Sequence, residues 1–240
     1  MTDATSSPAA GAAVSTHRDQ LCLALDLDDL VAAQRLAAEL NPYFGVAKVG
    51  LELFSASGSD AVANLIELGY DVFLDLKLHD IPTTVGRTAR VLGAYGARYL
   101  TLHAVGGAAM LRAGVEGLNE GAAAADLPAP TALAVTVLTS DSSAPPHIVP
   151  KRVRAALEGG CGGLVCAASD VREARQLAPR LRIVVPGIRP SDTDRDDQAR
   201  AATPREALDA GADLIVVGRP VTRAKDPVAA AEELTASLDT

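Results

Sequence analysis

The sequence predicts a single (β/α)8 barrel, and three observations support that prediction. Eight short apolar runs recur about every 25–30 residues, and amphipathic stretches with helical periodicity separate them. Continuous apolar strands that alternate with helices indicate a parallel sheet that is buried on both faces. Eight such units within 240 residues favour a closed barrel over a doubly wound sheet, which is the main alternative fold.

The predicted strands and helices alternate along the whole repeat. The strands are expected at residues 21–27, 46–49, 72–76, 99–103, 132–138, 163–167, 183–186 and 214–217. The helices are expected at residues 29–40, 59–69, 83–95, 107–122, 148–160, 170–179, 203–210 and 227–238. Four glycines follow helical patterns and predict left-handed C-terminal caps at Gly69, Gly96, Gly160 and Gly211.

The composition suits such a barrel and excludes some classes of function. Aromatic residues make up only 3% of the chain, so the core is expected to consist of small and branched aliphatic side chains. A net charge of −8 argues against nonspecific nucleic-acid binding, which needs a basic face. No apolar run reaches the roughly 18 residues that a membrane span needs, so we expect no membrane partner.

The cysteines and the N-terminal residues indicate a cytoplasmic protein. Cys22 and Cys166 lie inside apolar runs and are expected to be buried, reduced thiols. Cys161 and Cys166 lack the matching ligands of a zinc site. Residues 1–17 are rich in Ala, Ser and Thr and lack the pattern of a secretion signal. We expect a disordered tail over residues 1–17 and the barrel domain over residues 18–240.

The carboxyl ends of the predicted strands form the candidate active site, since barrel enzymes place their chemistry at that end. Nearly all of these ends carry polar, cationic or glycine residues: Asp26, Lys48, Asp75, Lys77, His103, Thr139, residues 186–189, Gly218 and Arg219. One polar strand end carries little information, but a ring of them indicates a ligand-binding mouth.

The stretch at residues 71–82 carries the strongest chemical signal. Asp75 and Lys77 are two residues apart in a predicted strand, so their side chains should share a face, with Lys48 in the same mouth. Alternating cations and carboxylates hold one another in place, and a lysine held in this way can donate a proton. A structural ion pair is the simpler alternative. A divalent metal at Asp26, Asp75 and Asp80 is disfavoured, because lysines occupy the space for its charge.

The ends of the last two strands predict a phosphate site, as in many barrels of this class. Gly218 allows a close backbone approach, and Arg219 can contact a phosphate with two hydrogen bonds. Arg189 opens a long polar loop that reaches to about residue 202 and is a candidate lid. The four aspartates of that loop should face solvent, which leaves the neutral Gln198 to reach the phosphate.

These residues resemble a known family. The segment D-L-K-L-H-D-I-P-T-T at residues 75–84 resembles the signature D-x-K-x-x-D-I-P-x-T of orotidine 5′-phosphate decarboxylases. Further segments match in order and spacing: L-A-L-D (23–26), A-K-V-G (47–50), V-T-V-L-T-S (135–140), P-G-I-R (186–189), D-Q-A-R (197–200) and V-V-G-R-P (216–220). The resemblance covers nearly the whole chain beyond the tail. The chain is similar to the shorter bacterial group of that family.

The resemblance implies decarboxylation of orotidine 5′-phosphate to UMP, the last step of de novo pyrimidine synthesis. It implies a charged tetrad formed by Lys48, Asp75, Lys77 and Asp80. Within this tetrad, Lys77 would protonate C6 of the substrate. It also implies that neither a metal nor an organic cofactor is needed. The resemblance also implies a homodimer, in which each subunit contributes Asp80, Ile81 and Thr84 to the site of the other subunit.

The same resemblance implies how the substrate is held. Asp26 and Lys48 would bind ribose hydroxyls, and Thr139 would lie by the pyrimidine ring, with the backbone of Ser140 nearby. The phosphate would be held by Arg189, Gln198, Gly218 and Arg219.

Two alternatives remain at this point. A sugar-phosphate decarboxylase or aldolase of the same barrel group, such as 3-keto-gulonate-6-phosphate decarboxylase or hexulose-6-phosphate synthase, would use Mg²⁺. Such relatives usually continue the motif as D-A-G, whereas this chain has Asp80-Ile81-Pro82. A barrel that only binds phosphorylated ligands is the other alternative, but it would not need lysines interleaved with carboxylates.

Overall fold

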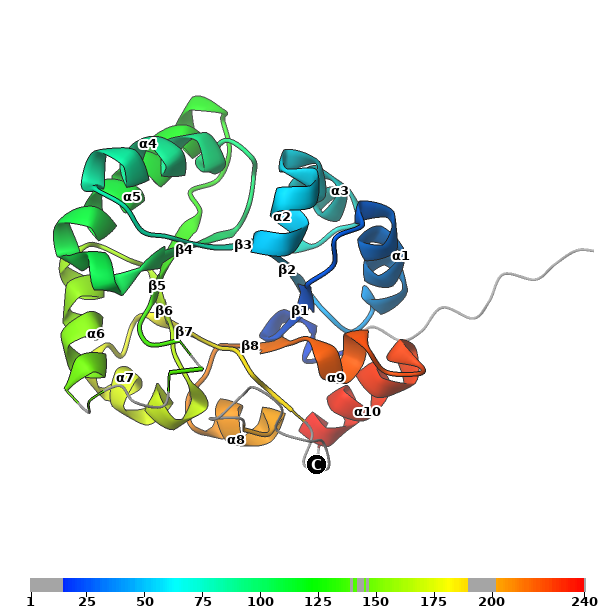
Figure 1. Cartoon of the computed structure of the whole chain (residues 1–240). Coiled ribbons are helices and arrows are strands. Elements are labelled where there is room, and N and C mark those ends of the chain that lie inside the picture. Colours follow the sequence, from blue (N-terminus) through cyan, green and yellow to red (C-terminus); the bar gives the residue numbers. More distant parts are fainter. Residues whose placement is uncertain (1–14, 139, 142–144, 146, 190–201, 240) are drawn as a thin grey trace, which may run out of the picture.

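Eight parallel strands close into a barrel in the computed structural model of the chain, which describes residues 15–138, 140–141, 145, 147–189 and 202–239 (Figure 1). The strands follow one another around the barrel in sequence order, and β1 closes it by pairing with β8, with Leu21 opposite Ile215. The strands are β1 (Leu21–Leu25), β2 (Val46–Gly50), β3 (Asp71–Leu78), β4 (Tyr99–His103), β5 (Thr131–Val135), β6 (Gly163–Val165), β7 (Arg182–Val185) and β8 (Leu214–Val217). The predicted fold class is confirmed.

A ring of helices surrounds the barrel (Figure 1). Eight of them match the predicted helices: α1 (Leu30–Leu40), α3 (Ser59–Glu67), α4 (Pro82–Gly93), α5 (Gly107–Ala124), α6 (Ile148–Glu158), α7 (Val171–Leu177), α8 (Pro204–Asp209) and α10 (Pro227–Asp239). The helical patterns did not reveal α2 (Leu51–Ser57) and α9 (Arg219–Thr222), because each is two turns or less and follows its strand without a break. Short 3-10 turns lie at Arg18–Gln20, Ala104–Gly106 and Ala168–Asp170.

Alternate strand residues build two separate cores. Leu21, Leu23 and Leu25 of β1 pack outward against the helices, whereas Cys22 and Ala24 point into the barrel. The interior of the barrel is filled by Cys22, Ala24, Val46, Phe73, Tyr99, Leu133, Val135, Val165, Val184, Leu214 and Val216. Because both faces are buried, the strands appear in the sequence as continuous apolar runs and not as alternating ones.

Glycine allows α4 and α5 to approach each other very closely. A Cβ atom added to Gly117 of α5 would overlap the carbonyl oxygen of Gly86 on α4, and one added to Gly121 would overlap that of Arg90. The left-handed backbone predicted at Gly69, Gly96, Gly160 and Gly211 is confirmed by their positive φ angles. Three of these glycines directly follow a helix C-cap, whereas Gly96 lies two residues beyond that of α4.

The N-terminal part of the described chain contacts the barrel. The backbone N–H of Ser15 donates to the carbonyl of Pro42, and His17 Nε2 lies 3.0 Å from Asp239 Oδ1 in α10. Most of the tail expected over residues 1–17 lies outside the described residues. All three cysteines are unpaired and buried, which was predicted for Cys22 and Cys166. Within the described chain, no helix is both long and apolar enough to cross a membrane.

Candidate active site

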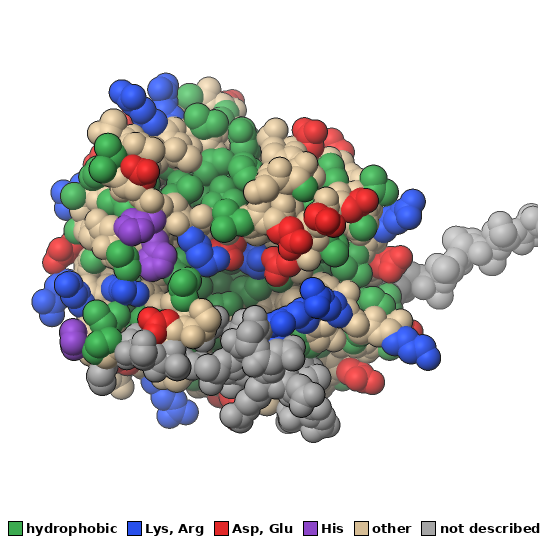
Figure 2. Space-filling model, viewed as in Figure 1, with side chains coloured by type: hydrophobic (Ala, Val, Ile, Leu, Met, Phe, Trp, Pro, Cys, Tyr) green, Lys and Arg blue, Asp and Glu red, His purple; other side chains and the backbone are tan. Residues whose placement is uncertain are grey.

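A cavity of about 480 Å³ opens at the carboxyl ends of the strands. Figure 2 shows it as a hollow near the centre of this face, with charged side chains around an apolar base. The base is formed by Phe73, Val135, Val165 and Val216. The polar residues that line the cavity include Asp26, Lys48, Glu52, Asp75, Lys77, Arg189, Arg219, Thr222 and Arg223. The cavity therefore lies where the strand ends predicted it.

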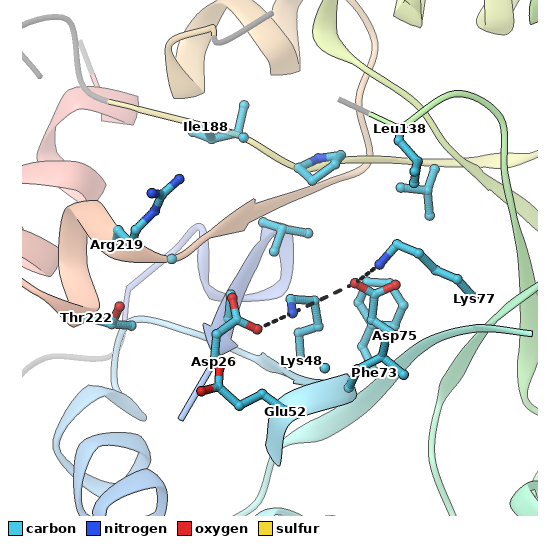
Figure 3. A pocket seen from close by; sticks show the side chains of 18 of the residues that line it. Asp26, Lys48, Glu52, Phe73, Asp75, Lys77, Leu138, Ile188, Arg219 and Thr222 are labelled. Atoms are coloured by element: carbon cyan, nitrogen blue, oxygen red, sulfur yellow. Dashed lines mark hydrogen bonds and ion pairs between the residues drawn. The ribbon is translucent and has the colours of Figure 1, made fainter. Parts of the chain in front are cut away.

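Four charged side chains form a continuous row along one side of this cavity (Figure 3). Lys48 Nζ lies 2.8 Å from Asp26 Oδ1 and 3.8 Å from Asp75 Oδ2. Lys77 Nζ lies 2.8 Å from the same Asp75 oxygen. These residues come from the adjacent strands β1, β2 and β3, or from directly after them, so parallel pairing brings the charges together. We call Asp26, Lys48, Asp75 and Lys77 the charged row.

Lys48 remains a cation at the centre of the charged row, although it is only 8% exposed. Burial alone would lower the pKa of Lys48, but the carboxylates of Asp26 and Asp75 outweigh burial and raise the pKa above its ordinary value. The ammonium thus occupies the space between two carboxylates that a metal ion would otherwise fill. Among the described residues, no group of His, Cys, Asp and Glu has a metal-binding arrangement.

The backbone of β3 is irregular where it carries Lys77. Lys77 has a φ of 49°, a left-handed conformation that is uncommon outside glycine. The pairing with β4 jumps here, because Leu74 lies opposite Leu100 while Leu78 lies opposite Leu102. Asp75 and Lys77 do meet on one side, as strand alternation predicted, but they meet across a bulge and not along a regular strand.

The opposite side of the cavity carries the predicted anion-binding residues. Gly218 directly follows β8 and is the N-cap of α9, which begins at Arg219. Arg219 lies across the cavity from Lys77 (Figure 3). Arg189 lines the same cavity and is 8% exposed. The backbone N–H of Arg189 donates to the carbonyl of Ala202, and this hydrogen bond holds the segment that follows β7 in place. Cationic side chains thus line the cavity on this side as well as in the charged row.

Other predicted site residues lie away from the cavity of their own chain. Asp80, Ile81 and Thr84 follow β3, are exposed, and do not line the cavity. Asp80 Oδ1 accepts a hydrogen bond from the backbone N–H of Ile81 at 2.6 Å. Ser140 is also exposed and outside the cavity lining. Thr139, Gln198 and the expected lid lie outside the described residues.

His79 and His103 form a pair beside the mouth. Their ring centroids are 5.8 Å apart, and His103 Nδ1 accepts the backbone N–H of Val105 at 3.3 Å. Burial, reinforced by the nearby charges of Arg152, His79 and Lys77, lowers the pKa of His103 below its ordinary value. His103 is therefore a neutral group at the edge of the site and does not line the cavity.

The sequence did not reveal four residues at or behind the site. Glu52, Thr222 and Arg223 line the cavity from the short helix α2 and from α9 and its C-terminal end, both missed by the helical pattern. Thr101 is fully buried in β4 and bonds to the charged row from behind. A hydroxyl inside an apolar strand, two residues before the polar strand end His103, was the available signal for Thr101.

Fold and site together define an α/β-barrel enzyme whose cavity is lined by paired lysines on one side and by arginine on the other. The comparison with family models narrows this class, since the model described as "Orotidine 5'-phosphate decarboxylase / HUMPS family" matches residues 19–234. The chain belongs to that family.

Curated relatives and solved structures agree with the family model. Orotidine 5′-phosphate decarboxylases from Anaeromyxobacter dehalogenans and Moorella thermoacetica are 47% and 44% identical to this chain, and each alignment covers 92% of it. The alignments cover 98% and 93% of those relatives. The crystal structure of the Lactobacillus acidophilus decarboxylase superposes with a TM-score of 0.77 at 34% identity, covering 92% of this chain and all of that one.

Proposed function

We propose that this protein decarboxylates orotidine 5′-phosphate to UMP, the last step of de novo pyrimidine synthesis. One observation carries the proposal: the charged row faces Arg219 across a single cavity in a chain of the decarboxylase family. The cavity offers cations for the phosphate at one side and a held lysine for the reacting base at the other. None of the relatives reported above bears the name of a Mg²⁺-dependent sugar-phosphate enzyme.

Lys77 is the proton donor in this mechanism. Loss of CO2 from C6 leaves a carbanion on the pyrimidine, and the Lys77 ammonium supplies positive charge and a proton to that carbon. Such stabilisation is stronger in the transition state than in the ground state, which is what accelerates a reaction. Asp75 holds the ammonium of Lys77 through Oδ2. The negative charge of Asp75 lies close to the proposed position of the substrate carboxylate and would repel it.

Lys48 completes the positioning of the row. Its ammonium contacts Asp26 and Asp75 together, so both carboxylates are held in place before substrate arrives. We assign Asp26 and Lys48 to the ribose hydroxyls. Asp80 is the fourth member of the proposed tetrad and acts in the neighbouring subunit.

Substrate binding extends from the phosphate to the pyrimidine ring. Phosphate oxygens are held by Arg189, Arg219 and the backbone at Gly218, with Gln198 as a further donor. We assign Thr139 to the pyrimidine ring, with only the backbone of Ser140 nearby. Binding energy from the phosphate, far from C6, serves to orient the base.

A homodimer completes each site in this proposal. Asp80, Ile81 and Thr84 lie outside the cavity of their own chain, and Ile81 is 66% exposed although it is apolar. A homodimer interface over this segment would cover the exposed Ile81 side chain. The three residues reach the site of the partner subunit, and Asp80 adds its carboxylate to the charged row there.

The reaction needs no cofactor in this proposal, because the lysine cations supply the charge that a metal would bring. Three buried, unpaired thiols fit a reducing cytoplasm as the place of action.

One assay tests the proposed activity. Purified protein is mixed with orotidine 5′-phosphate in EDTA, and the loss of substrate absorbance is followed, with UMP identified as the product. We expect turnover in EDTA. Absence of turnover in both EDTA and Mg²⁺ would refute the proposal, and turnover only after Mg²⁺ is restored would favour the sugar-phosphate class of mechanism.

Subunit mixing tests the shared site. Lys77→Ala and Asp80→Ala proteins are each expected to be inactive, and mixed dimers should regain activity because one of their two sites has both residues intact. Reassociated Lys77→Ala protein alone serves as the control. If mixed dimers stay inactive although they form, Asp80 acts within its own chain.

A further inference from the structure

We propose that Thr101 is a positioning residue for Lys77, the proton donor of the function proposed above, on which this inference rests. Thr101 does not line the cavity. It contacts the backbone of Lys77 and the side chain of Asp75 from inside β4 and thereby sets the position of the Lys77 ammonium.

The surroundings of Thr101 give its hydroxyl no access to water. Thr101 is 0% exposed and lies in the middle of β4, between the buried side chains of Leu100 and Leu102. A buried hydroxyl without partners destabilises a protein, so a threonine at this position needs hydrogen bonds within the fold. All hydrogen bonds of its hydroxyl in the described structure go to β3, over residues Leu74 to Lys77.

The hydrogen bonds of Thr101 have a definite direction. The backbone N–H of Lys77 donates to Thr101 Oγ1 at 2.8 Å. The hydroxyl has one proton to donate, and Asp75 Oδ1 at 3.1 Å is nearer than the carbonyl oxygen of Leu74 at 3.5 Å. Thr101 therefore accepts from the backbone of Lys77 and donates to the carboxylate of Asp75.

The first of these bonds maintains the bulge in β3. Between Leu74 and Leu78 the strand advances four residues while β4 advances two, so regular ladder bonds are lost there. Lys77 lies in this interval with its φ at 49°. Because an unpaired buried N–H is costly, the hydroxyl that replaces the missing ladder acceptor stabilises this uncommon backbone conformation.

The second bond fixes the rotation of the Asp75 carboxylate. Its Oδ1 faces Thr101, so its Oδ2 faces Lys77 Nζ at 2.8 Å and Lys48 Nζ at 3.8 Å. Asp75 is mostly buried, with a side-chain exposure of 14%. One hydroxyl thus acts on both ends of Lys77: directly on the backbone, and through Asp75 on the ammonium.

The test compares Thr101→Val, which keeps the shape of the side chain, with Thr101→Ser, which keeps the hydroxyl. The matched control is Thr136→Val. Thr136 is also 0% exposed, follows the next strand β5, and donates a buried hydrogen bond to the carbonyl of Val165 at 3.0 Å, away from the charged row. The control variant therefore also loses one buried hydroxyl.

We expect kcat for orotidine 5′-phosphate to fall about 10- to 100-fold in Thr101→Val, the range for lost hydrogen bonds to charged groups. KM should change less than about threefold, since Thr101 touches no ligand. Thr101→Ser should recover kcat to within about fivefold of wild type, and Thr136→Val should keep wild-type kcat despite a lowered melting temperature. A wild-type kcat in folded Thr101→Val would overturn the proposal.

A crystal structure of Thr101→Val gives a readout that does not depend on activity. We expect Lys77 to leave the left-handed region and its Nζ to move away from Asp75 Oδ2. An unchanged Lys77 in this structure would overturn the positioning role. If wild-type protein fails to turn over orotidine 5′-phosphate, the proposed function fails, while this structure still decides whether Thr101 positions Lys77.

Discussion

Lys77 Nζ lies 2.8 Å from Asp75 Oδ2, the same carboxylate oxygen that faces Lys48 Nζ at 3.8 Å. One carboxylate oxygen therefore holds two ammonium groups, and only Lys77, with a side-chain exposure of 33%, reaches well into the open cavity. Lys48 is the buried support and Lys77 is the cation available to a ligand. This division of roles leads to the first prediction.

Lys77→Met should abolish most of the catalysis while leaving the fold and ligand binding in place. Methionine keeps an unbranched side chain but cannot donate a proton, and proton transfer by a positioned group contributes about 10²- to 10⁴-fold to rates. We expect kcat to fall by at least that range, while the Kd of UMP by calorimetry stays within about fivefold. Lys151→Met, on the exposed face of α6, is the control with unchanged kcat. A Lys77→Met enzyme within tenfold of wild-type kcat would exclude Lys77 as the donor.

Arg219→Ala should lower kcat/KM only for substrates that carry the phosphate. Loss of charge-assisted hydrogen bonds corresponds to about 10- to 150-fold in kcat/KM for orotidine 5′-phosphate. The value of kcat/KM for orotidine, which lacks the phosphate, should stay within about twofold of wild type. Arg180→Ala, at the opposite end of the barrel, is the control, because Arg180 is exposed and remote from the cavity. Equal losses for both substrates would contradict phosphate binding by Arg219.

His103 should make the protein less stable as the pH falls. Its pKa is lowered in the folded state, so above the ordinary value of about 6.5 both folded and unfolded chains hold a neutral imidazole. As the pH falls below that value, the unfolded chain takes up the proton first and the fold loses stability. Protonation of Nδ1 would also remove the acceptor of the Val105 N–H.

The matching experiment uses His103→Asn, whose side-chain oxygen can still accept that N–H but does not titrate. Urea unfolding at pH 8 and pH 5.5 should show a smaller loss of unfolding free energy for His103→Asn than for wild type. An equal loss in the two proteins would mean that other groups cause the acid sensitivity.

Gly117→Ala should strongly destabilise the barrel by separating α4 from α5. The added methyl would overlap a backbone carbonyl of α4, and overpacking of this kind costs about 1–3 kcal/mol of unfolding free energy. Gly114→Ala, on the same helix, is the matched comparison, because its methyl would approach the Leu102 side chain at 2.6 Å, and a side-chain end can move aside. Denaturant unfolding should therefore rank Gly117→Ala below Gly114→Ala in stability. The reverse order would show that side-chain crowding governs this contact.

The strands and the main charged residues could be predicted because their causes are local. Runs buried on both faces are largely apolar, and Lys48, Asp75 and Lys77 stand out in the middle or the carboxyl-terminal part of their strands. The left-handed backbone at Lys77 has a distant cause, since its partner Thr101 lies 24 residues further on in another strand. Glu52 and Arg223 were missed for a different reason: each depends on a helix too short to show a periodic pattern. The expectations for Thr139 and Gln198 remain predictions.

Pairing of β1 with β8 has a consequence for how the binding site comes into existence. It joins residues about 190 positions apart, and the charged row at the start of the chain thereby meets Arg219 near its end (Figure 1). A nascent chain still lacking β8 presents half a site, whatever the state of its first three strands. Under the proposed function, orotidine 5′-phosphate contacts both halves of the site. Its binding would therefore stabilise the closed barrel against separation of β1 from β8.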